Sequence, residues 1–266
     1  DKELVDYVFS YLFYNCTNLI NASELILDST TLAEYCYRSM FEDCDSLTQA
    51  PELPATTLTS GCYQGMFNSC TSLTTAPELP ATTLAWGCYS SMFYGCTNLK
   101  SAPSLPSVLL AEGCYSCMFL GCTSLTEIPA GLFSGVTGAA ISMFASTFYG
   151  CTGLSRVTIP AGVTRIAGGA FEACENLQEF VVDEGSMSFA VIDGLLCNRA
   201  GTELIRCPYG ISDVIVPASI TNIGERAFSS IDSSIKITLS EGLKEIDSCA
   251  FIYCRGLTDI IIPQSV

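Results

Sequence analysis

The chain repeats itself every 26 residues over its first half. Four cysteines mark the step: Cys44, Cys70, Cys96 and Cys122. Neighbouring apolar residues keep the same spacing, namely Met40, Met66, Met92 and Met118, Phe41, Phe67, Phe93 and Phe119, and Leu47, Leu73, Leu99 and Leu125. Units of about 20–50 residues are typical of repeat proteins, in which each unit buries its apolar side against its neighbours. The repeat therefore predicts a solenoid of stacked units.

Each 26-residue unit contains two kinds of local pattern. In Cys-Tyr-x-x-Met-Phe-x-x-Cys, the residues Cys88, Met92 and Cys96 lie at i, i+4 and i+8, which predicts the apolar stripe of a short helix. The stretch 73–76 that follows such a segment is short and extended, and it ends at Pro77, which has no backbone donor. A second extended piece, 81–84, leads to the next helix. The expected fold class is an α/β repeat, a leucine-rich-repeat solenoid of short parallel strands and short helices.

The spacing changes in the second half. Cys122 and Cys151 are 29 residues apart, and Cys151 and Cys174 are 23 apart. We assign 1–151 to repeats of 26–29 residues, and 152–183 and 209–266 to repeats of the 23-residue type. Two β-rich runs, 189–197 and 203–207, flank a Gly-containing turn and predict one inserted β-hairpin over 184–208. No linker interrupts the array, so 1–266 is predicted to be a single domain.

Composition excludes several classes of function. The formal net charge is −16 with only 11 Lys and Arg, which argues against nucleic acid as a partner. No apolar run approaches the roughly 18 residues that a membrane-spanning helix needs. The chain has no histidine, so it lacks the usual general base and the commonest metal ligand. We therefore predict that it is not an enzyme and has no resident cofactor.

The sixteen cysteines do not have the spacing of a disulfide framework. On a helix, Cys88 and Cys96 would be about 12 Å apart, too far for a disulfide. Bridges between equivalent cysteines of adjacent repeats stay open, but small buried hydrophobic side chains are the simpler interpretation. Cys114 belongs to the repeat, and Cys117 is the additional member of a lone C-x-x-C. We interpret it as an incidental thiol, since a zinc site needs about four ligands.

The later repeats resemble a known family. Residues 154–174 read Leu-x-x-Val-x-Ile-Pro-x-x-Val-x-x-Ile-x-x-x-Ala-Phe-x-x-Cys, and 214–228 and 235–254 are similar. This pattern resembles the BspA-like leucine-rich repeat family of bacterial surface proteins. The resemblance implies parallel strands on one face, helices on the other, an extracellular location, and adhesion or protein binding. It supplies no catalytic motif.

Residues that share one position in successive repeats are the candidate sites. With Leu73 and Ala76 facing inward, Thr75 faces outward, and its equivalents are Gln49, Ser101 and Glu127. We expect this row to be the ligand-binding face. A second row, Glu24, Glu52 and Glu78, would place carboxylates on strands about 4.8 Å apart, so it is a weaker candidate for Ca2+. The tyrosines at 37, 63, 89 and 115 directly follow core cysteines, and we expect them to pack in the core.

The resulting functional hypothesis is a secreted or surface-anchored module that binds a host or matrix protein through its strand face. A glycan-binding accessory protein and a structural spacer are the alternatives. Exposed aromatic residues on the strand face would favour glycan, and a polar face would favour protein. Residues 260–266 follow the last repeat without a polar cap, which predicts self-association through that end or its cover by another part of a longer protein.

Overall fold

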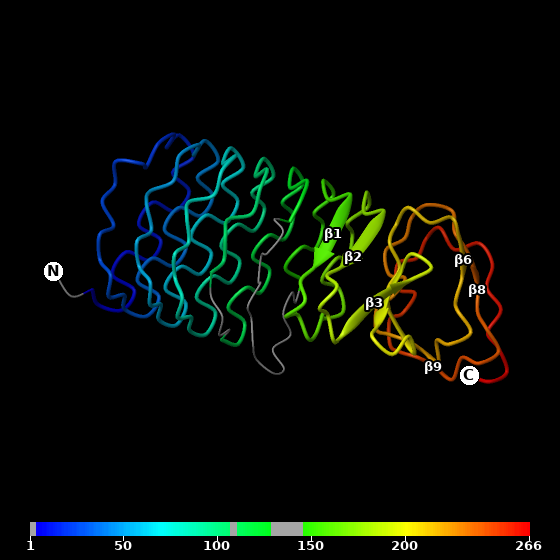
Figure 1. Cartoon of the computed structure of the whole chain (residues 1–266). Coiled ribbons are helices and arrows are strands. Elements are labelled where there is room, and N and C mark those ends of the chain that lie inside the picture. The colour runs from blue at the N-terminus through cyan, green and yellow to red at the C-terminus, as the bar shows by residue number, and fades with distance from the viewer. Residues whose placement is uncertain (1–3, 107–110, 129–145) are drawn as a thin grey trace.

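The computed structural model describes residues 4–106, 111–128 and 146–266 of the chain. Successive coils of the chain stack side by side into an elongated body, with the N-terminal coils at one end and the C-terminal coils at the other (Figure 1). Equivalent positions of neighbouring coils lie against each other, as the repeat predicts. The remaining stretches, 1–3, 107–110 and 129–145, lie outside this description, so the predicted single domain is described only in those three parts.

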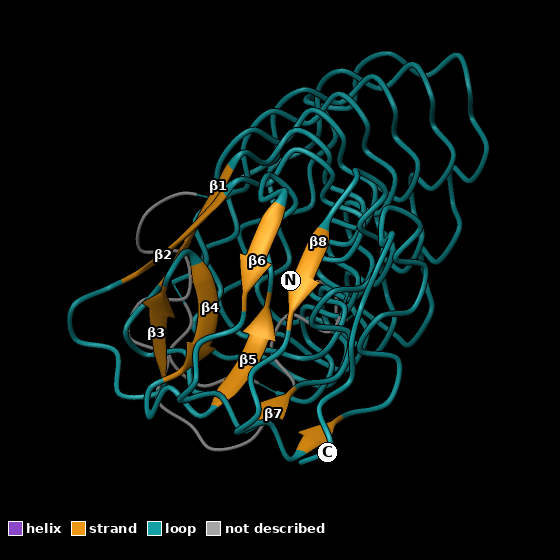
Figure 2. Cartoon of the chain, turned by 90° about the vertical axis from the view of Figure 1, so that its right-hand side faces the viewer, coloured by secondary structure: helices purple, strands orange, loops and turns teal. Residues whose placement is uncertain are grey.

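Regular strands are confined to the second half of the described chain (Figure 2). They are β1 (Arg156–Ile159), β2 (Glu179–Val182), β3 (Phe189–Ile192), β4 (Leu195–Asn198), β5 (Glu203–Arg206), β6 (Asp213–Ile215), β7 (Asn222–Ile223), β8 (Lys236–Thr238) and β9 (Glu245–Ile246). Parallel pairs join β1 to β2, β6 to β8, and β5 to β7 to β9. In the first half the same pairing is reduced to isolated parallel bridges, such as Thr31 with Thr57 and Thr57 with Thr83.

The predicted helices are wrong: the described residues contain none (Figure 2). In their place, each segment forms a run of turns in which every fourth residue has a positive φ, as at Gly61, Gly65 and Ser69. Alternate N–H groups bond within the coil, as Met66 N–H does to the Tyr63 carbonyl at 3.2 Å. The others donate to the next coil, as Phe67 N–H does to the Met92 carbonyl at 3.0 Å. We call these segments, 61–70, 87–96, 113–122 and their equivalents, the turn ladder.

The turn ladder explains why the apolar spacing suggested a helix. A period of four residues places i, i+4 and i+8 on one side, just as a helix nearly does. The residues that distinguish the turn ladder from a helix are those with a positive φ. Gly61 and Gly65 would each cost a helix interior about 1 kcal/mol relative to alanine, whereas both adopt left-handed backbone without a steric penalty. Glycine or a short polar residue occupies most of these positions and is thus the sequence signal for the ladder, although Tyr7, Tyr35 and Arg226 also have positive φ.

The core consists of columns of identical side chains that run along the stack. Phenylalanine rings at 13, 41, 67, 93, 119, 148 and 171 stack face to face, with neighbouring centroids 5.4–5.8 Å apart. The tyrosines at 37, 63, 89 and 115 form a second buried column with spacings of 5.8–6.1 Å, which confirms their predicted place in the core. Each ring covers its neighbours, so no unit buries its apolar side alone.

All sixteen cysteines are free. In one column each thiol donates to the carbonyl of a phenylalanine in the preceding coil, as Cys70 does to Phe41 and Cys96 to Phe67, both at 3.1 Å. Burial raises the pKa of the Cys96 thiol to about 12. The prediction of small buried side chains is therefore confirmed, although its helical argument was wrong. Cysteine suits this position because it is small and has a weak donor for an otherwise buried carbonyl.

The insertion lies within the predicted bounds of 184–208 but contains three strands, not the two of the single hairpin that we predicted. The run 189–197 itself folds at Asp193 and Gly194 into β3 and β4, which pair antiparallel, and β4 then pairs antiparallel with β5. Glycine at φ +81° makes this tight turn. The insertion also interrupts the phenylalanine column, which resumes with Phe228 and Phe251 at 5.1 Å. It divides the stack between the coil that ends at Cys174 and the coil that contains Phe228.

Candidate functional site

The four residues predicted to bind a ligand lie in one exposed row. Gln49 pairs with Asn21 and Ser101 with Glu127 through parallel bridges. Thr75 joins them because Lys100 N–H donates to the Thr74 carbonyl at 3.2 Å, which places Ser101 in the coil next to Thr75. All four predicted side chains are exposed. We call this line of residues the strand row.

The strand row extends beyond the residues that the sequence suggested. Arg156 and Glu179, each two residues after a buried leucine, are register partners in β1 and β2 and form an exposed ion pair at 3.3 Å. Asn21 extends the row at its other end. Their common position relative to Leu19, Leu154 and Leu177 was the signal that could have found them. The side chains of the row are uncharged from Asn21 to Ser101 and charged from Glu127 to Glu179.

The predicted calcium row has no further support in the structure. Glu24, Glu52 and Glu78 are all exposed. In the described ranges, no three or more acidic, cysteine or histidine side chains are grouped as they would be around a metal ion. Calcium binding by these three glutamates stays a prediction. Cys117 is half-buried, and its sulfur lies 3.8 Å from the Ser116 hydroxyl.

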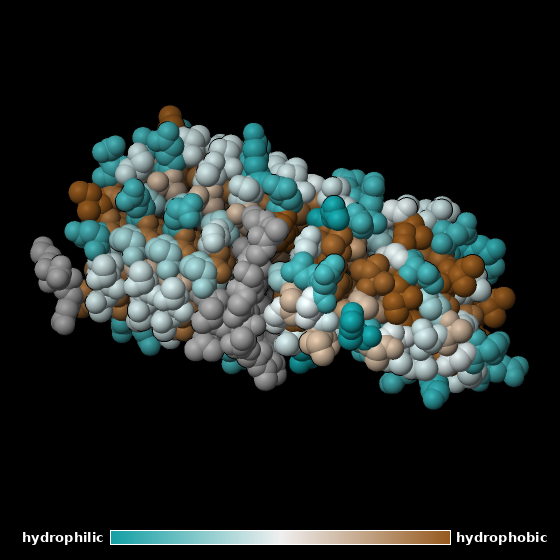
Figure 3. Space-filling view, viewed as in Figure 1, coloured by the Kyte–Doolittle hydropathy of each residue, from teal (hydrophilic) through white to brown (hydrophobic). Residues whose placement is uncertain are grey.

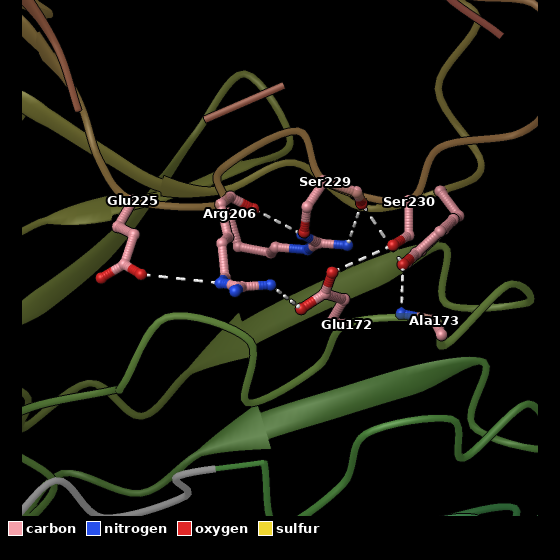
Figure 4. Close-up of polar contacts among 8 residues, drawn as sticks. Glu172, Ala173, Arg206, Glu225, Ser229 and Ser230 are labelled. Carbon is pink, nitrogen blue, oxygen red and sulfur yellow. Dashed lines mark hydrogen bonds and ion pairs between the residues drawn. The ribbon is translucent and has the colours of Figure 1, made fainter. Parts of the chain in front are cut away.

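A network of buried polar groups joins the two parts of the stack where the insertion separates them (Figure 4). The Glu172 carboxylate, 3% exposed, accepts from Arg226 at 2.8 Å and from the Ser230 hydroxyl at 3.1 Å. Arg206 donates to the Ser229 hydroxyl at 2.7 Å and to the Ser229 carbonyl at 2.9 Å. The Tyr209 hydroxyl accepts from the Ala173 N–H, a ladder donor that elsewhere meets the next coil. We call this network the polar bridge.

Beside the polar bridge lies a groove of about 530 Å³. One side is the coil segment 164–171, and the other is formed by the insertion and by 224–226. Ile166, Phe171 and Ile205 give it apolar walls, and Arg165, Glu203 and Asp247 give it charge. Burial and then the nearby Asp247 carboxylate raise the pKa of Glu203. Nothing in the repeat pattern pointed to this groove, because it depends on the path of the insertion.

The surface is not uniform in polarity. In the view of Figure 3, the N-terminal half is mostly hydrophilic or neutral, and hydrophobic side chains gather toward the C-terminal coils. Exposed aromatic residues occur on other parts of the coil than the strand row: Trp86, Tyr94 and Tyr149 lie in or beside the turn ladder. Among the described residues, no helix has the length and apolar character to cross a bilayer.

Comparison with known proteins identifies the family. The profile of the BspA type leucine rich repeat region matches six copies over residues 2–102, 66–190 and 205–266. The chain belongs to this family. No curated protein sequence matches it.

Three solved structures of bacterial proteins are similar to this chain in fold. A leucine rich cell surface protein from Faecalibacterium prausnitzii is 25% identical with a TM-score of 0.59, over 96% of this chain and 57% of that one. A leucine-rich repeat protein from Eubacterium ventriosum is 20% identical with a TM-score of 0.62, over 93% and 60%. The pneumococcal vaccine antigen PcpA is 19% identical with a TM-score of 0.62, over 82% and 51%. The chain thus spans a little more than half the length of these proteins.

Proposed function

We propose that this chain is a non-enzymatic recognition module at the bacterial cell surface or outside the cell, which binds a host or matrix protein through the strand row. The observation that carries the proposal is the row itself: exposed polar side chains repeat at one position over successive coils. Extended faces of this kind are what repeat proteins use to bind other macromolecules. Family membership and the likeness to a leucine rich cell surface protein support the location.

The character of the row favours protein over glycan. Its residues are Gln49, Thr75, Ser101 and Glu127, followed by the Arg156–Glu179 ion pair. Amides, hydroxyls and charges of both signs match the polar rim of a protein interface. Sugars are instead commonly held against exposed aromatic rings, and the half-exposed Trp86 lies away from the row. A glycan-binding role would therefore use the Trp86 side of the coil.

A binding screen tests the proposal. The chain is applied to immobilised matrix proteins and to a glycan array, together with the double variant Thr75→Arg, Ser101→Arg. Two arginines in the middle of the row should reduce protein binding at least about tenfold, since a misplaced charge in an interface costs more than about 1.4 kcal/mol. The matched control is the double variant Thr57→Arg, Thr83→Arg, which adds the same two charges at exposed threonines of the other extended segment. Equal loss in the control, or no loss in the Thr75→Arg, Ser101→Arg variant, would place the binding surface elsewhere.

A further inference from the structure

The groove beside the polar bridge contains a stretch of unpaired backbone. In the coil after the insertion, the residues equivalent to 165–166 form β7, which is bonded on both sides, to β5 and to β9. Asn222 N–H donates to the Thr202 carbonyl at 3.0 Å, and the Ile223 carbonyl accepts from Asp247 N–H at 2.8 Å. In the coil before the insertion, residues 163–167 form no strand.

The cause is the insertion. The coil segment 164–168 should pair with the next piece of chain, but β5 pairs with β4 and β7 instead. In β7, certain backbone groups point toward the next coil. The corresponding groups of segment 164–168 are the Thr164 carbonyl and the Ile166 N–H and carbonyl. Within the described part of the chain these three groups have no hydrogen-bond partner. An edge of this kind is a template for another strand.

The groove has the size and chemistry for an extended peptide. About 530 Å³ is within the range of pockets that hold ligands, and a strand of four residues is only about 13 Å long. Ile166 and Ile205 offer apolar contact. Glu203 and Asp247 line the same groove and have no ion-pair partner in the described residues, so they would attract a cationic side chain. Of the arginines in the lining, Arg226 is paired with Glu172 and Arg206 donates to Ser229, and Arg165 lies on the 164–171 side of the groove. The raised pKa of Glu203 agrees with two carboxylates that repel each other in a partly buried place.

We propose that this groove binds an extended basic peptide segment of a partner protein, which adds a strand to the edge at 164–168 and places a lysine or arginine against Glu203 and Asp247. Strand addition supplies affinity through backbone hydrogen bonds, and the two carboxylates supply selectivity. Two members of the polar bridge, Arg206 and Arg226, also line the groove, and Arg226 bonds to Glu172 at 2.8 Å. This site is separate from the strand row. The peptide proposal can therefore be tested independently of the proposed function.

The probe is a synthetic peptide with blocked ends, Thr-Val-Lys-Val-Thr, whose β-branched residues favour an extended chain. Its binding to the full chain is followed by fluorescence anisotropy. Two matched peptides are compared, one with glutamate in place of lysine and one with alternate amides N-methylated. Both should bind at least roughly tenfold more weakly, since each loses charge-assisted or backbone hydrogen bonds. Equal binding of all three peptides would overturn the proposal.

Two further measurements locate the peptide. Glu203→Gln should weaken the lysine peptide about five- to tenfold, while Glu241→Gln, an exposed carboxylate outside the groove, should leave it unchanged. Residue-resolved hydrogen exchange should show the Ile166 amide becoming protected when the peptide binds. An Ile166 amide that exchanges as fast with saturating peptide as without it would exclude strand addition at this edge, whatever the affinity.

Discussion

Replacing Gly113 with alanine distinguishes a turn ladder from a helix, because the substitution should destabilise a ladder and stabilise a helix. Gly113 has a φ of +64°, and a Cβ built on it meets no atom within 4 Å. The substitution therefore changes backbone preference and nothing else. In a helix the same change should stabilise the chain by about 1 kcal/mol.

In the ladder the effect is opposite. Left-handed backbone costs an alanine about 1–2 kcal/mol, and the stiffer unfolded chain returns about 0.4–1 kcal/mol of this. The net loss is then about 1 kcal/mol, or a melting temperature lower by roughly 2–4 °C for a chain of this size. Gly113→Asn should lose less, because asparagine tolerates this backbone.

The assay is thermal and urea unfolding of the two variants beside the unchanged chain. Gly61→Ala provides a graded comparison, since it has the same backbone cost and its Cβ would also overlap the Tyr35 ring. The expected order of stability is unchanged chain, Gly113→Asn, Gly113→Ala, Gly61→Ala. A Gly113→Ala variant that melts above the unchanged chain would refute the ladder.

Two other predictions concern buried groups. Arg226→Ala leaves the Glu172 carboxylate buried without its cation and should lower the free energy of unfolding by about 3 kcal/mol. Arg156→Ala, which breaks the exposed ion pair with Glu179, should lower it by less than about 1 kcal/mol. Urea midpoints of the two variants give the comparison, and equal losses of stability would contradict it. The second prediction concerns pH. An unfolded thiol loses its proton near pH 9, whereas the pKa of Cys96 in the folded chain is about 12. The free energy of unfolding should therefore fall as the pH rises between these values, by about 1.4 kcal/mol per pH unit for each such thiol. Urea midpoints measured under reducing conditions between about pH 8 and 10.5 test this, and a constant midpoint would be evidence against buried thiols.

Sequence periodicity predicted the parts of the fold that depend on one coil covering the next. Phe67 and Tyr63 are fully buried in columns because every coil supplies the same side chain at the same place. It failed on the backbone of that segment, since apolar residues at i, i+4 and i+8 fit a helix and a four-residue turn ladder equally well. Gly61 and Gly65 carried the missing information. The groove could not be predicted, because it arises where chain that does not repeat displaces chain that does.

The turn ladder also bears on where a ligand can bind. When helices line one side of a coil and strands the other, the two sides differ in width and the stack must bend. Here both sides are joined by hydrogen bonds from coil to coil, as at Phe67 and at Thr57 with Thr83, so neighbouring coils keep similar spacings on both sides. The stack in Figure 1 is accordingly close to straight before the insertion. We therefore expect a partner of the strand row to meet a regularly spaced surface, whereas the groove beside β5 exists because the insertion breaks the stack.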